Sequence, residues 1–189
     1  MKEQVVHVLN QIHPLSGGLQ EALFTLLKEV HLKSKEVYLR EGETSKKIAF
    51  ILQGLMRSYY INAKGEEITN WFMKEGDVTI SVKSFFGQVP SKEFVAAIEP
   101  TVLLYVTYDE LQQLYNNYPE FNIVGRRLTE KYYTLCEERL LGIRSLTAKE
   151  RYHSLLALHP EIVQRCPDKY IASYLGIGVR TLAREKSSW

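Results

Sequence analysis

The sequence predicts an α+β fold: an N-terminal antiparallel β-barrel or jelly roll, a long helix, and a small C-terminal helical domain. Aromatic and β-branched residues are frequent in residues 30–82, where they occur in short runs. Glycines separate these runs at intervals of about eleven residues. This spacing is typical of short strands joined by turns. Apolar residues then recur every three to four positions over 120–144, which predicts a helix. The expected domains are residues 1–119, 120–145 and 146–189.

The first thirty residues are predicted to be helical. Val5, Val6, Leu9 and Ile12 recur at helical spacing, Pro14 interrupts the pattern, and Ser16 can cap a second helix. Within the predicted barrel, the segment NAKGEE is a hairpin turn, because its glycine readily adopts the positive φ that tight turns require. The segments EFVAAIE and TVLLYVTY on either side of Pro100 are predicted to be its last strand pair.

The predicted long helix over 120–145 needs a partner for its apolar stripe. Packing against the barrel and self-association through a coiled-coil-like seam both satisfy this need. The sequence alone does not decide between them. For self-association, the candidate dimer residues are Val124, Leu128, Tyr132 and Leu135.

The last forty residues contain the pattern of a helix-turn-helix. Thr147 and Glu150 have the spacing of a capping box, and short helices are expected at 148–158, 160–164, 168–175 and 178–186. Gly176 permits a tight turn between the last two. Five residues are then left on the outer face of the final helix as candidates for DNA contact: Val179, Arg180, Thr181, Arg184 and Lys186.

Charge and cysteine content favour a polyanion-binding protein of a reducing compartment. Residues 139–189 hold nine basic and four acidic side chains, whereas residues 1–138 hold 15 and 18. A basic C-terminal region suits nucleic acid. The two cysteines and five histidines have no metal-ligand spacing, so no metal or cofactor is expected. Without a signal peptide or a long apolar run, we expect a cytoplasmic protein that does not contact membranes.

The whole pattern resembles the Crp/Fnr family of bacterial transcription regulators, in the short form common in Bacteroidetes. The resemblance covers nearly the whole chain and is most specific in LTAKERYHSLLALHPEIVQRCPDKYIASYLGIGVRTLAR. It implies a cyclic-nucleotide-binding-like barrel, a dimerisation helix, and a winged-helix-type DNA-binding domain. It also implies a homodimer on near-palindromic promoter sites of double-stranded DNA, with RNA polymerase as a further partner.

The residues at the family's nucleotide-binding positions differ from those that hold a cyclic nucleotide. The family's Gly-Glu pair is replaced by Ile80 and Ser81, and its Arg-Ser pair by Ser91 and Lys92. The carboxylate for the ribose and the bidentate guanidinium for the phosphate are therefore missing. On the long helix, Cys136 and Glu137 take the positions that face the nucleotide. We expect these six residues to line a pocket for another small molecule, or for none.

The predicted DNA-reading helix also departs from the family. Gly178 is a weaker N-cap than the usual Ser or Thr, and Arg180 replaces a base-contacting Glu, which shifts preference toward guanine or phosphate. Because the chain stops soon after Glu185, no β-wing is expected. The predicted function is a dimeric transcription regulator with an unknown effector. The alternative is a small-molecule sensor or interaction protein whose helix-turn-helix no longer reads DNA. No catalytic motif occurs, so we expect no enzyme.

Overall fold

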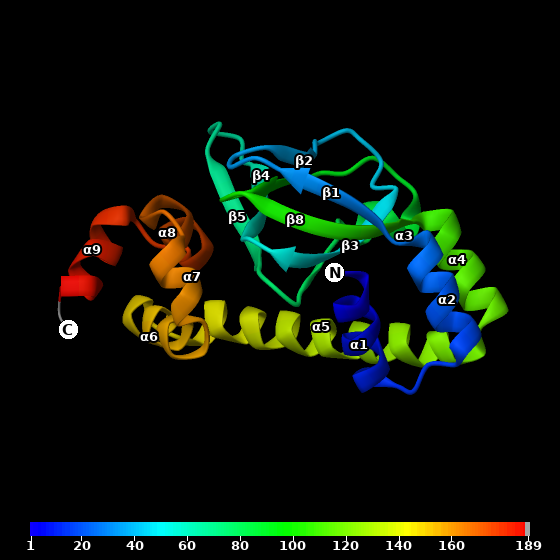
Figure 1. The fold of residues 1–189 in the computed structure, drawn as a ribbon. Helices are drawn as coiled ribbons and strands as arrows, with labels where there is room; N and C mark the ends of the chain where they lie inside the picture. The colour runs from blue at the N-terminus through cyan, green and yellow to red at the C-terminus, as the bar shows by residue number, and fades with distance from the viewer. Residues whose placement is uncertain (188–189) are drawn as a thin grey trace.

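A computed structural model describes residues 1–187. It places a two-sheet β-body above one long helix, with helices at both ends (Figure 1). The helices are α1 (Lys2–Ile12), α2 (Gly17–Leu26), α3 (Val82–Gly87), α4 (Tyr108–Asn117), α5 (Pro119–Ser145), α6 (Ala148–Leu158), α7 (Pro160–Arg165), α8 (Asp168–Leu175) and α9 (Val179–Ser187). The strands are β1 (Lys28–Leu32), β2 (Val37–Leu39), β3 (Lys47–Gln53), β4 (Met56–Ile61), β5 (Glu67–Met73), β6 (Val78–Thr79), β7 (Phe94–Ala97) and β8 (Thr101–Thr107).

The β-body is an antiparallel jelly roll, which confirms the predicted fold class. One sheet has the strand order β1-β8-β3-β6 and the other β2-β7-β4-β5. Apolar side chains from both sheets fill the space between them, as alternation along each strand requires. The buried members are Leu32, Leu39, Ala49, Ile51, Met56, Met73, Val95, Ala97 and Leu103.

The predicted turns and caps are present. The hairpin between β4 and β5 has Gly65 at φ +78°, and the Ser16 hydroxyl accepts a hydrogen bond from the Leu19 N–H at the start of α2. Thr147 and Glu150 form the predicted capping box of α6. The short helix α3, however, was not predicted: six residues are too few to show helical periodicity, and the segment reads as the continuation of a strand.

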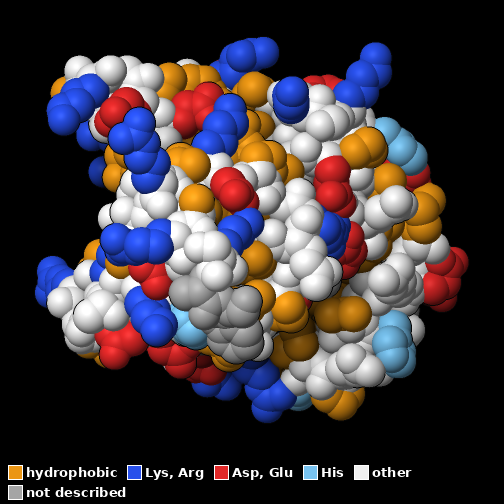
Figure 2. Space-filling view, turned by 90° about the vertical axis from the view of Figure 1, so that its left-hand side faces the viewer, with side chains coloured by type: hydrophobic (Ala, Val, Ile, Leu, Met, Phe, Trp, Pro, Cys, Tyr) orange, Lys and Arg blue, Asp and Glu red, His pale blue; other side chains and the backbone are white. Residues whose placement is uncertain are grey.

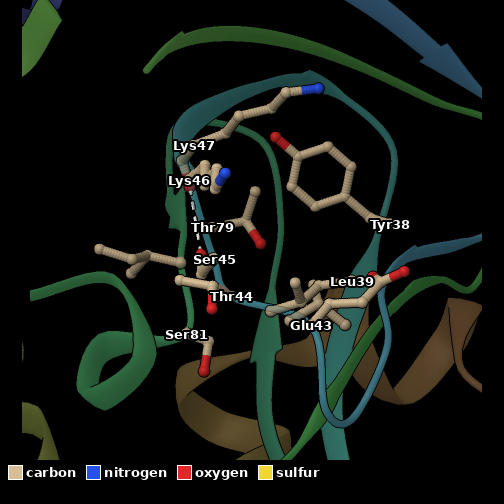
Figure 3. Close-up of a pocket in the computed structure, with 11 residues that line it drawn as sticks. Tyr38, Leu39, Glu43, Thr44, Ser45, Lys46, Lys47, Thr79 and Ser81 are labelled. Atoms are coloured by element: carbon tan, nitrogen blue, oxygen red, sulfur yellow. Dashed lines mark hydrogen bonds between the residues drawn. The ribbon is translucent and has the colours of Figure 1, made fainter. Parts of the chain in front are cut away.

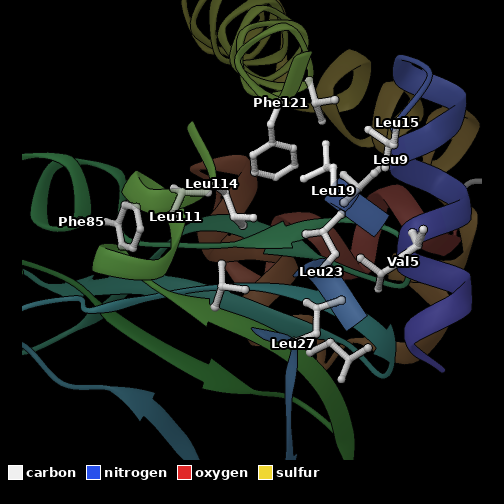
Figure 4. Packing of buried hydrophobic residues seen from close by; sticks show 14 residues of the cluster. Val5, Leu9, Leu15, Leu19, Leu23, Leu27, Phe85, Leu111, Leu114 and Phe121 are labelled. Atoms are coloured by element: carbon white, nitrogen blue, oxygen red, sulfur yellow. The ribbon is translucent and has the colours of Figure 1, made fainter. Parts of the chain in front are cut away.

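The N-terminal helices share a core with the start of the long helix. Val5, Leu9, Leu19 and Leu23 from α1 and α2 meet Phe121 of α5 and the buried side of α4 (Figure 4). Val124, one turn further along α5, is also fully buried in this cluster. The first part of α5 is therefore anchored on the protein's own body. Within residues 1–187, no helix combines the length and the apolar character needed to cross a membrane.

The four C-terminal helices form a compact unit that shares its core with the β-body. Ile171, Ala172, Leu175 and Leu182 are buried on the inner face of the helix-turn-helix, and Ile177 packs against them half-buried. The same cluster also includes Leu55 and Phe72 of the β-body. The predicted third domain, 146–189, ends in two residues, 188–189, that lie outside the described part of the chain.

Candidate functional site

The helix-turn-helix consists of α8 and α9 joined by a left-handed residue. Gly176 ends α8 with φ +65° and ψ +37°, a conformation that glycine adopts without steric cost. The Ile177 N–H then donates to the Ala172 carbonyl at 3.0 Å. This turn directs α9 away from the body, at the end of the molecule opposite α2 and α4 (Figure 1).

The five residues predicted to contact DNA lie on α9, but they differ in exposure and in whether they already form ion pairs. Arg180 and Val179 are exposed, and Thr181 is half-buried. Arg184 is exposed and lies 3.2 Å from the Glu185 carboxylate, while the Lys186 ammonium pairs with Asp168 at the start of α8. Lys and Arg side chains project from much of the face that carries α9 (Figure 2).

The helix-turn-helix is docked on the free edge of the second sheet. The Ser173 hydroxyl on α8 accepts from the Thr69 N–H of β5 at 2.9 Å and donates to the Glu67 carbonyl at 3.1 Å. One side chain thus takes the place of a neighbouring strand. Beside it, the buried Arg57 guanidinium lies 3.5 Å from the ring centroid of Tyr170, also on α8.

An ion-pair cluster completes this docking contact. The Arg165 guanidinium at the end of α7 donates to both carboxylate oxygens of Glu75, at 2.8 and 2.9 Å, and also pairs with Glu99. These hydrogen bonds from Arg165 lower the pKa of Glu75 to about 2, since the charged carboxylate is the form that the guanidinium favours. The same contacts raise the pKa of Arg165.

Three of the six predicted pocket residues come together beside α3. The Ser81 and Ser91 hydroxyls are 3.1 Å apart, and Ser81 donates to the Glu93 carboxylate at 2.8 Å. Ile80 precedes Ser81 and lines a cavity with it. Lys92 is exposed. The cradle therefore presents a carboxylate and two hydroxyls already bonded to one another, which is unsuitable for a phosphate.

The structure does not bring Cys136 and Glu137 to that cradle. Both side chains are exposed on α5, and neither lines the cavity beside Ile80 and Ser81. The side of α5 that turns toward the β-body carries the half-buried Tyr132, Leu135 and Arg139 instead. The Tyr132 hydroxyl, for example, accepts from the Val78 N–H of β6 at 2.8 Å.

The four predicted dimer residues lie on the inner face of α5. Val124 is fully buried, Leu128 packs on the same cluster, and Leu135 lines a groove beside Tyr132 against the C-terminal unit. A different stripe is exposed, and only its last member, Ile143, also borders that groove. Its exposed members are Tyr133, Cys136, Leu140 and Ile143, whose alternating spacing of three and four residues is the a/d pattern of a coiled coil. That spacing in the sequence was the signal that could have identified the stripe.

A cavity of about 180 Å³ lies between the two sheets, lined by residues of β2, β3, β6, β7 and the loop that joins β2 to β3. Tyr38 and Thr79 project into it from opposite sides, and Lys46 and Lys47 lie near its opening (Figure 3). The hydroxyl oxygens of Tyr38 and Thr79 are buried and lack a hydrogen-bond partner. Sequence reasoning missed both residues, because a Tyr and a Thr in strands usually indicate only β-propensity.

Comparison with protein families finds one match, in the middle of the chain. Residues 29–118 match the model of the cyclic nucleotide-binding domain. This range runs from β1 to the residue that precedes α5, so it covers the jelly roll, α3 and α4. A comparison with curated protein sequences finds no significant match.

Solved structures share the fold over most of the chain. FixK2 from Bradyrhizobium japonicum superposes with a TM-score of 0.71 at 22% identity, covering 86% of this chain and 83% of that one. The c-di-GMP responsive global regulator CLP of Xanthomonas campestris gives 0.70 at 14% identity, with 92% and 91% covered. The catabolite activator protein of Thermus thermophilus gives 0.59 at 15% identity, with 96% and 85% covered. At these identities the comparison shows a shared fold.

Proposed function

We propose that the protein is a DNA-binding transcription regulator, because residues 29–118 match the cyclic nucleotide-binding domain, the chain shares the fold of the regulators FixK2 and CLP, and it ends in a helix-turn-helix. It acts as a homodimer on near-palindromic promoter sites, with RNA polymerase as a further partner. The observation that carries the proposal is the α8–Gly176–α9 geometry, which leaves Arg180 and Arg184 exposed on one helix. A helix of this kind fits the major groove.

The proposed roles of the exposed arginines differ. Arg180 lies in the first turn of α9, the part of a recognition helix that contacts base edges, and its guanidinium can bond to both acceptors of guanine. Arg184 lies one turn later and already contacts Glu185, so we assign it to a phosphate. Lys186 must leave Asp168 before it contacts DNA.

The proposed dimer uses the outward stripe of α5. Tyr133, Cys136, Leu140 and Ile143 are exposed apolar or weakly polar side chains at coiled-coil spacing, and a second copy of the same helix can cover them. A parallel pair of α5 helices places two α9 helices on the same side of the dimer. Two-fold symmetric DNA sites follow from that symmetry.

We propose that the effector, if the protein has one, is not a cyclic nucleotide. The Ser81–Ser91 pair bonds to the Glu93 carboxylate, and in the described residues no arginine hydrogen-bonds to this cradle. The charge at the expected phosphate position is therefore negative. Calorimetric titration of the protein with cyclic AMP or cyclic GMP should give no heat of binding.

Selection of bound duplexes from a random DNA pool tests the proposal, followed by a salt titration of any enriched site. A two-fold symmetric consensus is expected, with affinity falling steeply as salt rises. Arg180→Ala should cost about 1–3 kcal/mol per half-site and relax one base position, whereas Arg184→Ala should reduce the salt slope. Arg126→Ala on α5 is the matched control, since its partner is Glu130 on the same helix.

The second candidate function is a sensor or interaction protein that does not read DNA. Two basic groups of α9 are already held by Glu185 and Asp168, and α8 is bonded to β5. A folded dimer that enriches no duplex even at low salt would support this candidate. Binding of the Arg180→Ala and Arg184→Ala variants at wild-type strength would contradict our assignment of the DNA-binding face.

A further inference from the structure

The cavity between β2 and β6 contains two buried hydroxyl groups without partners. Thr79 is fully buried on β6, and the Tyr38 ring comes from β2 in the opposite sheet. Neither oxygen has a hydrogen-bond partner among the described residues. Burial of the Tyr38 ring also raises its pKa, so the group stays a neutral donor. A buried polar group without a partner costs about 1–3 kcal/mol, and such a group in a native structure needs a reason.

The cavity lies inside the β-body, between strands of different sheets. Tyr38 and Leu39 come from β2 and Val95 from β7 of one sheet, and Lys47 comes from β3 and Thr79 from β6 of the other. The loop that joins β2 to β3 adds Glu43, Thr44, Ser45 and Lys46 to the lining. In Figure 3 the Tyr38 hydroxyl points across this cavity toward the side that carries Thr79. The two groups therefore converge on one small volume.

The opening of the cavity carries positive charge. Lys46 and Lys47 are exposed at its edge, and neither forms an ion pair with a carboxylate within residues 1–187; the Lys47 ammonium lies 4.5 Å from the ring centroid of Tyr105. Glu43 also lines the opening, but its carboxylate accepts from the Arg40 N–H at 2.8 Å. Two lysines beside one engaged carboxylate favour an anion.

The size of the cavity limits the ligand. A cavity of about 150 Å³ accommodates one benzene molecule, and this one measures about 180 Å³. A cyclic nucleotide is several times larger than benzene and does not fit inside. The lining also includes Leu39, Ile80 and Val95, which give the middle of the cavity an apolar wall.

From these observations we infer that the cavity is a binding site for a short monocarboxylate. The carboxylate lies at the opening between Lys46 and Lys47, and the body of the molecule contacts the apolar wall. A hydroxyl or carbonyl group at the inner end bonds to Tyr38 and Thr79. Ser81 borders both this cavity and the Ser81–Ser91 cradle. Binding here requires no DNA, so it can be tested independently of the proposed function.

Thermal denaturation and calorimetry of the DNA-free protein test the inference, with lactate, pyruvate, butyrate and benzoate as probes. Their uncharged amides are the matched controls. At least one carboxylate should raise Tm and bind, while its amide should bind at least tenfold more weakly. Lys46→Gln and Lys47→Gln should each weaken binding about tenfold, because a hydrogen bond to a charged group is worth about 1.5–3 kcal/mol. Lys83→Gln, an exposed lysine on α3, should leave the affinity unchanged.

The hydroxyl groups need their own variants. Tyr38→Phe and Thr79→Val remove only the oxygen's contribution, and they should weaken binding of lactate or pyruvate about threefold to tenfold while butyrate changes less. Tyr115→Phe changes a half-buried tyrosine near Gly125 and is the control. Three outcomes would overturn the inference: no carboxylate binds, amides bind as well as carboxylates, or binding survives unchanged in Tyr38→Phe and Thr79→Val. Removal of a hydroxyl without a partner should not unfold the protein, which circular dichroism checks.

Discussion

Gly54 and Gly65 are both left-handed residues of the β-body, but their surroundings differ. Gly54 has φ +107° and Gly65 φ +78°. A Cβ at Gly54 would meet backbone atoms of Pro100 and Thr101 at 2.7 Å, whereas a Cβ at Gly65 would meet nothing within 4 Å. Gly54 is therefore required by space as well as by conformation.

We expect Gly65→Ala to lower the free energy of unfolding by about 1 kcal/mol, the cost of a left-handed alanine. Gly54→Ala should cost at least about 1–3 kcal/mol more, because the backbone of the β7–β8 turn must move. Urea unfolding of both variants measures the difference. Equal losses would show that the contact at Gly54 relaxes without cost.

The Glu75 carboxylate makes the docking contact sensitive to acid. Its pKa is lowered from 4.5 to about 2 by Arg165, so its contribution to stability is complete above about pH 4.5 and is lost as the pH falls toward 2. The side chain is 39% exposed, and solvent screening limits the effect to about 1 kcal/mol or less. Glu99 and the neighbouring Lys74–Glu161 pair face the same region.

Glu75→Gln should lower Tm at neutral pH and flatten the loss of Tm between about pH 4.5 and 2. Thermal denaturation across this range, compared with wild type, gives the measurement. Glu66→Gln is the control, since Glu66 lies in the β4–β5 turn and its carboxylate accepts from Asn62 in the same turn. If Tm of the Glu75→Gln variant depends on pH in the same way as Tm of the wild type, Glu75 does not have the assigned role.

Sequence predicted single residues well where their partners are local. The Ser16 cap and the Thr147–Glu150 capping box join residues three positions apart, and such contacts follow from spacing alone. Ser173 and Thr69, by contrast, are 104 positions apart. Nothing in a single sequence indicates that this serine bonds to a strand edge, because that contact exists only after both units have folded.

At the scale of elements, α5 shows what periodicity can and cannot predict. Apolar spacing gave the helix, observed as Pro119–Ser145, but two stripes run along it. The stripe through Val124 and Leu135 contacts the protein's own body, and the stripe through Tyr133 and Leu140 is exposed. A sequence pattern does not show which stripe a β-body will cover, since that depends on how the chain folds back.

The exposed stripe makes a prediction about helix pairing. In a parallel dimer, Cys136 lies on the seam and faces its own copy, while Cys166 is buried and the pKa of its thiol is raised to about 12. Short bismaleimide cross-linkers should therefore produce a covalent dimer from wild type and from Cys166→Ser, but not from Cys136→Ser. Non-reducing gel electrophoresis gives the readout.

Substitution on the same stripe tests the dimer without cross-linking. Leu140→Glu places a charge in the seam and should shift the protein to a monomer in sedimentation at micromolar concentration. Leu158→Glu is the matched control, because Leu158 is equally apolar and 68% exposed but lies on α6. If both variants remain dimers, the seam lies elsewhere on the surface.

For the whole molecule, the decisive feature is that the core of the C-terminal unit extends into the β-body. Phe72 of β5 is 5% exposed and belongs to the cluster formed by α6, α8 and α9. Its ring centroid lies 4.9 Å from that of Tyr174 on α8. The helix-turn-helix is therefore held to the β-body by apolar contact as well as by Ser173 and Arg165. For the helix-turn-helix to separate from the β-body, buried apolar area must be exposed in addition to the breaking of ion pairs.

Phe72→Ala should therefore loosen the C-terminal unit while the jelly roll stays folded. Truncating a buried phenylalanine costs about 3–5 kcal/mol, and here the loss falls on the contact between the two units. Phe85→Ala is the matched control: Phe85 is fully buried in the N-terminal cluster, so a similar loss there weakens the body and not the contact. Hydrogen exchange should show faster exchange confined to α6–α9 in Phe72→Ala and spread over α1, α2 and α4 in Phe85→Ala. Uniform acceleration in both variants would mean that the two units unfold only together, and that α9 cannot be reoriented without global unfolding.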